Sequence, residues 1–156
     1  MITVEFPGGD KVQLEHAVFD FNGTLAVDGI ISPTTAERLK KLMDKLEVHV
    51  ITANTYGSAV EALAGMGVHL VLLEQGPGGP QKRDFVDRLG PEKVIALGNG
   101  RNDAEMLKAA ALGIVIIGRE GAASEAIMAA DIACYSIEDA LDCLLNPQRL
   151  VATLRS

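Results

Sequence analysis

Short runs of aliphatic and β-branched residues alternate with amphipathic stretches along most of this chain, and this alternation restricts its fold more than any other feature. The apolar runs have the length of buried strands and lie at residues 16–21, 48–52, 69–73, 94–97, 114–117 and 131–134. The stretches between and after them have helical spacing, and they follow Ser32 or occupy residues 58–65, 81–89, 102–111, 122–129 and 136–145. Such alternation predicts an α/β fold with a doubly wound, mainly parallel, Rossmann-like sheet, helices on both faces and right-handed crossovers.

The amino-terminal segment has a different pattern. Residues 2–6 and 11–14 flank a Pro-Gly-Gly-Asp turn at 7–10, which predicts a β-hairpin that leads into the first strand of the sheet. The 156 residues, 48% of them apolar, suit a single domain over residues 1–156 with an adequate core. The aromatic content of only 4% predicts that this core is aliphatic.

Charge and cysteine content exclude several classes of partner and site. The formal charge of -7 argues against nucleic acid or an anionic membrane as the main partner, because both attract clustered Lys and Arg. No run approaches the roughly 20 apolar residues that span a bilayer, and the first residues lack a signal-peptide pattern, so a cytoplasmic protein is expected. Cys134 and Cys143 lack a CxxC arrangement and are expected to be buried or half-buried free thiols.

The run at 16–21 carries a carboxylate, Asp20, close to its end, followed at once by an Asn-Gly-Thr turn at 22–24. In open α/β sheets, ligands bind outside the carboxyl ends of the strands, so a carboxylate here can attack a phosphoryl group or hold a metal. The alternative is an Asx turn, which the same residues favour.

Other polar residues follow the later strands in a fixed order: Thr52, Lys82, then Asn99 with Asp103. Together with Asp20 they have the side chains that phosphoryl transfer needs. A carboxylate is the nucleophile, a hydroxyl and an ammonium bind the non-bridging oxygens, and an acidic pocket holds Mg²⁺. Asp20, the backbone carbonyl of Asn22, and Asn99 or Asp103 can supply oxygen ligands for that ion.

Each of these residues also has a simpler interpretation. Thr52 suits a strand, Asp103 suits the start of a helix, and residues 98–100 suit a tight turn. Lys82 opens a predicted helix, where the helix dipole disfavours a cation, and a bound anion would explain that placement. The combination in this order favours the catalytic interpretation.

These residues resemble the haloacid dehalogenase (HAD) superfamily. Its signature is a DxDGT-like first motif, a Thr or Ser that ends the second core strand, a Lys, and a GDxxxD or GDGxND segment. The counterparts here are DFNGT at 20–24, Thr52, Lys82 and GNGRND at 98–103. With the hairpin, these motifs look most like the soluble P-type ATPase-like proteins of that superfamily.

The resemblance implies that Asp20 becomes phosphorylated during turnover and that Mg²⁺ is the cofactor. The catalytic residues that it implies are Asp20, Asn22, Thr52 and Lys82, and the metal ligands are Asp20, Asn22, Asn99 and Asp103. The substrate-binding residues that it implies are Gly23, Thr24, Thr52, Ala53, Asn54, Lys82 and Asn102.

Two positions depart from the HAD pattern. Phosphatases of the superfamily usually carry a second Asp two residues after the nucleophile, and Asn22 cannot transfer a proton as that Asp does. Asn99 stands where a metal-binding Asp is usual, so one negative charge is lost. Slow turnover, a preference for good leaving groups, or loss of catalysis are the expected consequences.

The intervals between the motifs are too short for a cap domain. The 27 residues between Thr24 and Thr52 hold one helix and a short flap, and the segment from Thr52 to Lys82 holds a helix, a strand and a loop. The expected partner is a phosphorylated small molecule or a phosphorylated macromolecule. An open site favours a large or macromolecular substrate, or a homo-oligomer in which a neighbouring subunit covers the site.

The sequence thus supports a Mg²⁺-dependent phosphohydrolase, either a phosphatase or ATPase-like, that acts on phosphate esters or anhydrides through phosphorylated Asp20. A non-catalytic or phosphoryl-carrying signalling or binding module is the alternative. A response-regulator receiver is disfavoured, because its phosphorylated Asp lies in the middle of the chain.

Overall fold

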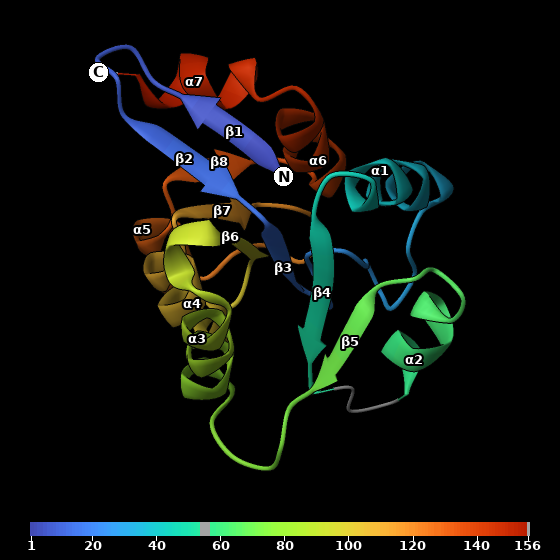
Figure 1. Cartoon of the computed structure of the whole chain (residues 1–156). Helices are drawn as coiled ribbons and strands as arrows, with labels where there is room; N and C mark the ends of the chain where they lie inside the picture. Colours follow the sequence, from blue (N-terminus) through green and yellow to red (C-terminus); the bar gives the residue numbers. More distant parts are fainter. Residues whose placement is uncertain (54–56, 156) are drawn as a thin grey trace.

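A computed structural model describes residues 1–53 and 57–155, and its centre is a sheet of parallel strands (Figure 1). The order across this six-stranded sheet is β5-β4-β3-β6-β7-β8. The strands are β3 (His16–Asp20), β4 (Glu47–Thr52), β5 (His69–Leu72), β6 (Val94–Gly98), β7 (Leu112–Ile116) and β8 (Ile132–Cys134). The chain starts in the middle, moves to one edge, and returns past β3 to the other. The predicted doubly wound α/β sheet is confirmed.

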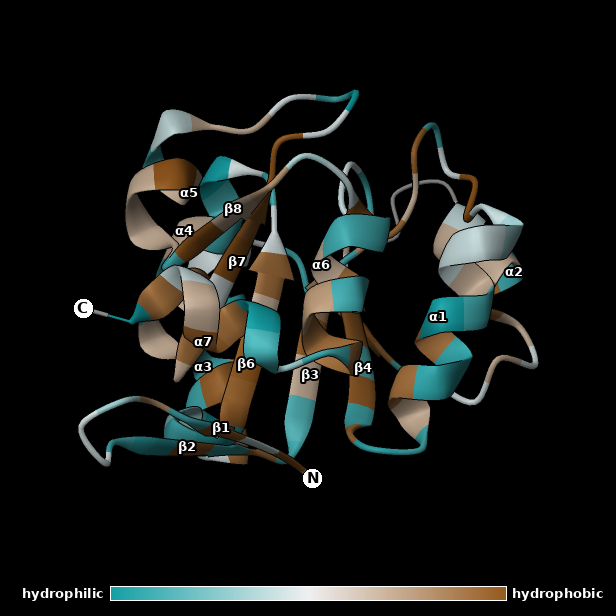
Figure 2. Ribbon diagram, turned by 90° about the horizontal axis from the view of Figure 1, so that it is seen from above, coloured by the Kyte–Doolittle hydropathy of each residue, from teal (hydrophilic) through white to brown (hydrophobic). Residues whose placement is uncertain are grey.

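Helices cover both faces of the sheet. One face packs against α1 (Pro33–Met43), α2 (Ser58–Leu63), α6 (Ile137–Leu145) and α7 (Gln148–Leu154). The other packs against α3 (Gly78–Leu89), α4 (Ala104–Ala109) and α5 (Ser124–Ala129). Figure 2 shows apolar strands in the interior and polar residues on the outward sides of the helices. Alternate strand residues feed two separate apolar clusters, as expected for strands buried on both sides.

The predicted amino-terminal hairpin is also confirmed. Strands β1 (Ile2–Glu5) and β2 (Lys11–Leu14) pair antiparallel as a separate two-stranded sheet. Ile2, Val4 and Leu14 are buried in the cluster that includes Leu150 of α7. The hairpin therefore covers part of the core, and residue 15 links it directly to β3.

One helix boundary and one additional helix differ from the prediction. Helix α3 begins at Gly78, whereas the Gly/Pro composition of residues 75–80 predicted a loop. The first-turn N–H groups of any helix lack intrahelical partners, so Pro80 can lie in that turn without losing a bond. Helix α7 was not predicted, although Leu150 is buried and Leu154 packs partly against the core.

The segment between Thr24 and Lys82, where HAD caps are inserted, contains α1, β4, α2, β5 and the first residues of α3 and, over its described residues, no further domain. The start of α1 agrees with the sequence, because the Ser32 side chain accepts a hydrogen bond from the Thr35 N–H and Pro33 is the first helical residue.

Among the helices that the structure describes, none combines the length and apolar content needed to cross a bilayer.

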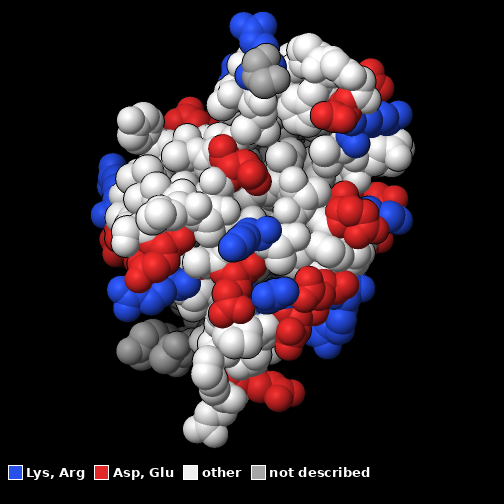
Figure 3. Space-filling view, turned by 90° about the vertical axis from the view of Figure 1, so that its left-hand side faces the viewer, with Lys and Arg blue, Asp and Glu red and all other residues white. Residues whose placement is uncertain are grey.

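The surface over one side of the molecule carries charges of both signs. Lys and Arg side chains are interspersed with Asp and Glu in the view of Figure 3.

Both cysteines are free, Cys134 buried and Cys143 half-buried, as expected.

Candidate functional site

The turn that follows β3 is built around Gly23. The N–H groups of Thr24 and Ala26 donate to the Phe21 carbonyl, at 3.3 and 2.9 Å, and the Gly23 N–H donates to the Ala26 carbonyl at 2.8 Å. Gly23 has φ +76, and a Cβ there would lie 2.3 Å from Nδ2 of Asn99. A glycine is therefore required both by the backbone and by the close approach of Asn99.

Lys82 lies between two carboxylates beyond the ends of β3 and β6. Its Nζ donates to Oδ1 of Asp20 at 2.7 Å and to Oδ1 of Asp103 at 2.6 Å. The side chains are 1% exposed for Lys82, 12% for Asp20 and 0% for Asp103. A buried ammonium with two charge-assisted hydrogen bonds fixes the Asp20 carboxylate in place.

Asp103 is held from its other side by the backbone. Its Oδ2 accepts hydrogen bonds from the N–H groups of Asn99, at 3.0 Å, and Gly100, at 2.8 Å. A Cβ on Gly98 would lie 2.6 Å from the Asp103 side chain, so only glycine permits this approach at the end of β6. Asp103 thus anchors Lys82 to the loop after β6.

Thr24 joins Asp20 to Asn99. Its hydroxyl lies 3.3 Å from Oδ2 of Asp20 and 3.3 Å from Oδ1 of Asn99. The Asn99 Nδ2 group donates to the Gly121 carbonyl at 3.1 Å, which turns the amide oxygen towards Thr24. Two acceptor oxygens therefore flank the single hydroxyl of Thr24 at this edge of the sheet.

Burial governs the charge state of the cluster. Burial and the nearby Asp103 charge raise the pKa of Asp20 to about 6, although Lys82 opposes the shift. For Lys82, burial opposes the charged form, but Asp20 and Asp103 outweigh it and raise the pKa above its ordinary value. Lys82 is therefore an ammonium at neutral pH, and Asp20 is ionised only above about pH 6.

The sequence of this chain is similar to that of an archaeal protein. No model of a protein family matches the sequence. An uncharacterized protein of Methanocaldococcus jannaschii is 56% identical over 64 residues, which make up 41% of this chain and 69% of that protein. At this identity and coverage, the chain belongs to the same family as the archaeal protein.

Solved structures are similar over nearly the whole chain. The cobalt-bound deoxy-D-mannose-octulosonate 8-phosphate phosphatase of Haemophilus influenzae has a TM-score of 0.73 at 16% identity, covering 92% of this chain and 94% of that one. A Legionella pneumophila protein assigned to subfamily III A of the HAD superfamily has a TM-score of 0.71 at 17% identity, covering 90% and 87%. This is the HAD fold.

A further HAD-fold neighbour was solved with ligands. The 3-deoxy-D-manno-octulosonate 8-phosphate phosphatase of Moraxella catarrhalis, in complex with magnesium, phosphate and KDO, has a TM-score of 0.71 at 14% identity. The match covers 89% of this chain and 90% of that one.

The HAD fold brings several of the predicted residues together and leaves others apart. Asp20, Thr24, Lys82, Asn99 and Asp103 form the connected cluster described above. Thr52 is buried at the end of β4, one residue beyond the Ile51 that pairs with Asp20.

The remaining predicted site residues lie at the surface or outside the residues that the structure describes. Asn22, Ala53 and Asn102 are exposed. Asn102 lies in the short 3-10 helix η2 (Arg101–Asp103), beside Gly78 at the start of α3. Asn54 lies outside the described residues.

The position of Lys82 in its helix needs correction. Lys82 was expected to open a helix, and binding of an anion by Lys82 stays a prediction. Helix α3 begins four residues earlier, so Lys82 lies in its second turn, and Asp20 and Asp103 provide the negative charge.

The donor atoms fit a magnesium ion. The Asp20 carboxylate, the Asn22 backbone carbonyl and the Asn99 amide oxygen are hard oxygen ligands of the kind that Mg²⁺ selects. Asp103 is fully buried, and both of its oxygens accept hydrogen bonds, so in this arrangement it positions Lys82. A direct bond from Asp103 to the metal stays a prediction.

A pocket of about 570 Å³ opens beside the turn that follows Asp20. Its lining includes Thr24, Ile30, Arg119, Tyr135 and Glu138. Sequence reasoning missed Arg119 and Tyr135, although a signal existed. They follow β7 and β8, so the strand-end argument that selected Asp20 applies equally to them.

Proposed function

We propose that this protein is a Mg²⁺-dependent phosphohydrolase that uses Asp20 as its nucleophile. The observation that carries this proposal is the position of Asp20, whose carboxylate ends a central strand and is held at 2.7 Å by a buried ammonium. Phosphatases among the structural neighbours, which share the HAD fold, support the same reaction class.

The first chemical step transfers the phosphoryl group to the protein. An Asp20 oxygen forms a bond to phosphorus as the bond between phosphorus and the leaving oxygen breaks. The ammonium of Lys82 and the Thr52 hydroxyl stabilise the non-bridging oxygens. The leaving oxygen takes its proton from solvent, because the Asn22 amide is not an acid.

The second step releases inorganic phosphate. A water oxygen attacks phosphorus, the bond between phosphorus and Asp20 breaks, and the water proton passes to solvent. No carboxylate stands at position 22 to accept that proton, so we expect this step to be slow.

The metal would be held by Asp20, the Asn22 carbonyl and Asn99. When bound, Mg²⁺ supplies positive charge next to the phosphoryl oxygens. With Asn99 in place of a carboxylate, we expect weaker binding than in a site with two carboxylates.

The pocket beside Thr24 supports a small phosphorylated metabolite as substrate. Its volume of about 570 Å³ is in the range of small-molecule sites. Arg119 adds a cation to its lining, and Ile30 and Ile116 add apolar surface. We propose that the leaving group occupies this pocket and carries an anionic or hydrogen-bonding substituent.

Asn22 favours a second candidate, a module that keeps the phosphoryl group. Phosphate release from a panel of sugar phosphates, nucleotides and acetyl phosphate tests the choice, with Asp20→Asn and EDTA as controls. Release that needs both Mg²⁺ and Asp20 supports the enzyme. Release that persists in Asp20→Asn would overturn the nucleophile, and stoichiometric phosphorylation without release would favour the carrier.

A further inference from the structure

We infer that the opposite end of the sheet holds a second metal site, formed by His16, Glu47 and His49, for a borderline transition-metal ion such as Zn²⁺. These residues lie at the amino ends of β3 and β4, away from the Asp20 cluster at the carboxyl ends. The site is therefore separate from the proposed magnesium site.

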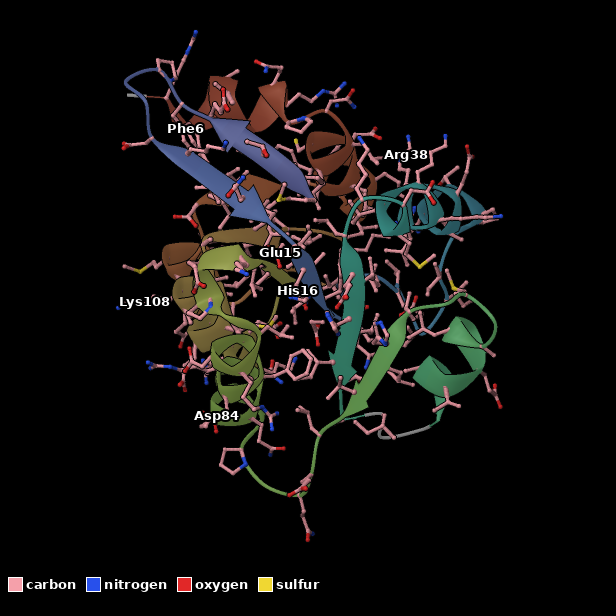
Figure 4. The ribbon with its side chains drawn as sticks, viewed as in Figure 1. Phe6, Glu15, His16, Arg38, Asp84 and Lys108 are labelled. Carbon is pink, nitrogen blue, oxygen red and sulfur yellow. The ribbon has the colours of Figure 1, made fainter. Side chains whose placement is uncertain are left out.

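The strand register creates this cluster. In the parallel pairing of β3 with β4, His16 is opposite Glu47 and Val18 is opposite His49. Side chains alternate between faces along a strand, so Glu47 and His49 lie on one face, and His16 lies beside them. Figure 4 shows His16 next to Glu15 where the hairpin joins β3.

The distances match three corners of a tetrahedral site. Nδ1 of His16 lies 3.3 Å from Nε2 of His49 and 3.2 Å from Oε2 of Glu47, and the His49 to Glu47 distance is 3.9 Å. With zinc–ligand bonds of 2.0–2.2 Å, adjacent tetrahedral corners are about 3.3–3.6 Å apart. Two distances therefore need almost no adjustment, and the third needs a small rotation of an exposed carboxylate.

The surroundings hold one of the ligands in place. His49 is buried against the rings of His69 and Phe85, with ring centroids 5.1 and 5.4 Å away. This packing fixes the imidazole with its Nε2 towards His16 and Glu47.

Access also suits an ion. The Glu47 side chain is 64% exposed, and a pocket of about 390 Å³ adjoins it, which leaves space for a water as fourth ligand. Lys45 and Met1 line this pocket together with Asp44 and with Glu15, which is paired with Lys93 at 3.2 Å. Imidazole nitrogens favour zinc, nickel, cobalt or copper over magnesium.

A hydrogen bond between His16 and His49 is the competing explanation for their approach, and zinc binding separates the two. The full chain, stripped with EDTA and then held in excess Mg²⁺ to occupy the oxygen site, is titrated with Zn²⁺ by calorimetry. We expect the wild type to bind one more Zn²⁺ than His16→Gln. Loss of one ligand should weaken this site more than about 100-fold, because loss of a ligand's hydrogen-bond partner alone costs about 10–100-fold.

Two further variants keep the test decisive. Glu47→Gln changes an exposed side chain and should also lose the site, which covers the case in which His16→Gln fails to fold. His69→Gln alters a ring that stacks on His49 but lies outside the three ligands, and it should retain the site. Equal Zn²⁺ stoichiometry and affinity in the wild type, His16→Gln and Glu47→Gln would overturn the inference.

Cobalt provides an independent spectroscopic readout. Co²⁺ in a tetrahedral nitrogen-containing site absorbs visible light far more strongly than octahedral Co²⁺ on oxygen ligands. We expect the strong bands in the wild type and in Asp20→Asn, and their loss in Glu47→Gln. Bands lost in Asp20→Asn and kept in Glu47→Gln would assign the ion to the other end of the sheet and contradict the proposal.

Discussion

The ammonium of Lys82 donates a 2.7 Å hydrogen bond to the carboxylate of Asp20, although 62 residues separate them along the chain. Asp103 accepts a second bond from the same ammonium, so two carboxylates share one buried cation. The net charge of this buried group is therefore -1 when all three residues are ionised. A site of this kind favours an incoming cation such as Mg²⁺ beside Asp20.

Replacement of Lys82 by Met should destabilise the protein. Two buried carboxylates would lose the cation that they share, and breaking such a buried pair costs about 3–5 kcal/mol. Urea unfolding at pH 8 measures the change, with Lys41→Met as the control because Lys41 forms an exposed pair with Glu37. Equal stabilities for Lys82→Met and Lys41→Met would contradict the structural role of Lys82.

Asp20→Asn should stabilise the metal-free protein at pH 8. The folded-state pKa of Asp20 is raised to about 6, so above that pH the folded state carries an unfavourable buried charge that Asn lacks. A shift of this size corresponds to roughly 1–3 kcal/mol in the free energy of unfolding. Thermal unfolding in EDTA tests the gain. In saturating Mg²⁺ the wild type should recover, and a variant less stable than wild type in EDTA would show that the charge is not unfavourable.

The contribution of His49 to the free energy of unfolding should fall as the pH is lowered from about 6.5 towards 4 in EDTA, and it is measured in the Asp20→Asn background because the raised pKa of Asp20 acts in the opposite direction. The folded-state pKa of His49 is depressed to about 4 from 6.5, so the unfolded chain binds a proton in that window and the folded chain does not. The stabilising contribution is complete above pH 6.5 and decreases by about 2–3 kcal/mol towards pH 4. His49→Gln should lack this part of the pH dependence while His69→Gln keeps it, and identical slopes in both variants would contradict the assignment.

Asn22→Asp should accelerate phosphate release. The new carboxylate can protonate the leaving oxygen and later accept a proton from water, and such catalysis contributes typically 10²–10⁴-fold. The rate at which Asp20 is phosphorylated by a poor leaving group, such as a sugar phosphate, should increase more than its rate with acetyl phosphate, whereas hydrolysis of the adduct should accelerate equally for both. No acceleration of either step would show that proton transfer does not limit turnover.

The fold was predictable because local patterns and global topology agree. Residues 94–97 read as a buried strand and form β6, and Ser32 reads as a cap and caps α1. Helix α7 was not predicted, because Leu150 and Leu154 form only a short apolar stripe. The helix is stabilised by packing near the hairpin rather than by its local sequence. That contact is long-range and is absent from any local window.

The site was predictable to the extent that strand ends converge. Asp20 could be selected because it lies close to the end of an apolar run, and Asp103 because it follows one, but the sequence did not reveal that Lys82 lies between them. The cluster of His16, Glu47 and His49 depends on the register between β3 and β4, which a single sequence does not specify.

The nucleophilic role of Asp20 is tested most directly by locating the phosphoryl group. The wild type is mixed with acetyl phosphate and Mg²⁺, quenched in acid within its first turnovers, and its phosphorylated peptide is sequenced by tandem mass spectrometry. We predict one phosphoryl group per chain, on Asp20, present in the wild type and absent from Asp20→Asn. A phosphoryl group on any other residue, or an unchanged adduct in Asp20→Asn, would contradict the proposal.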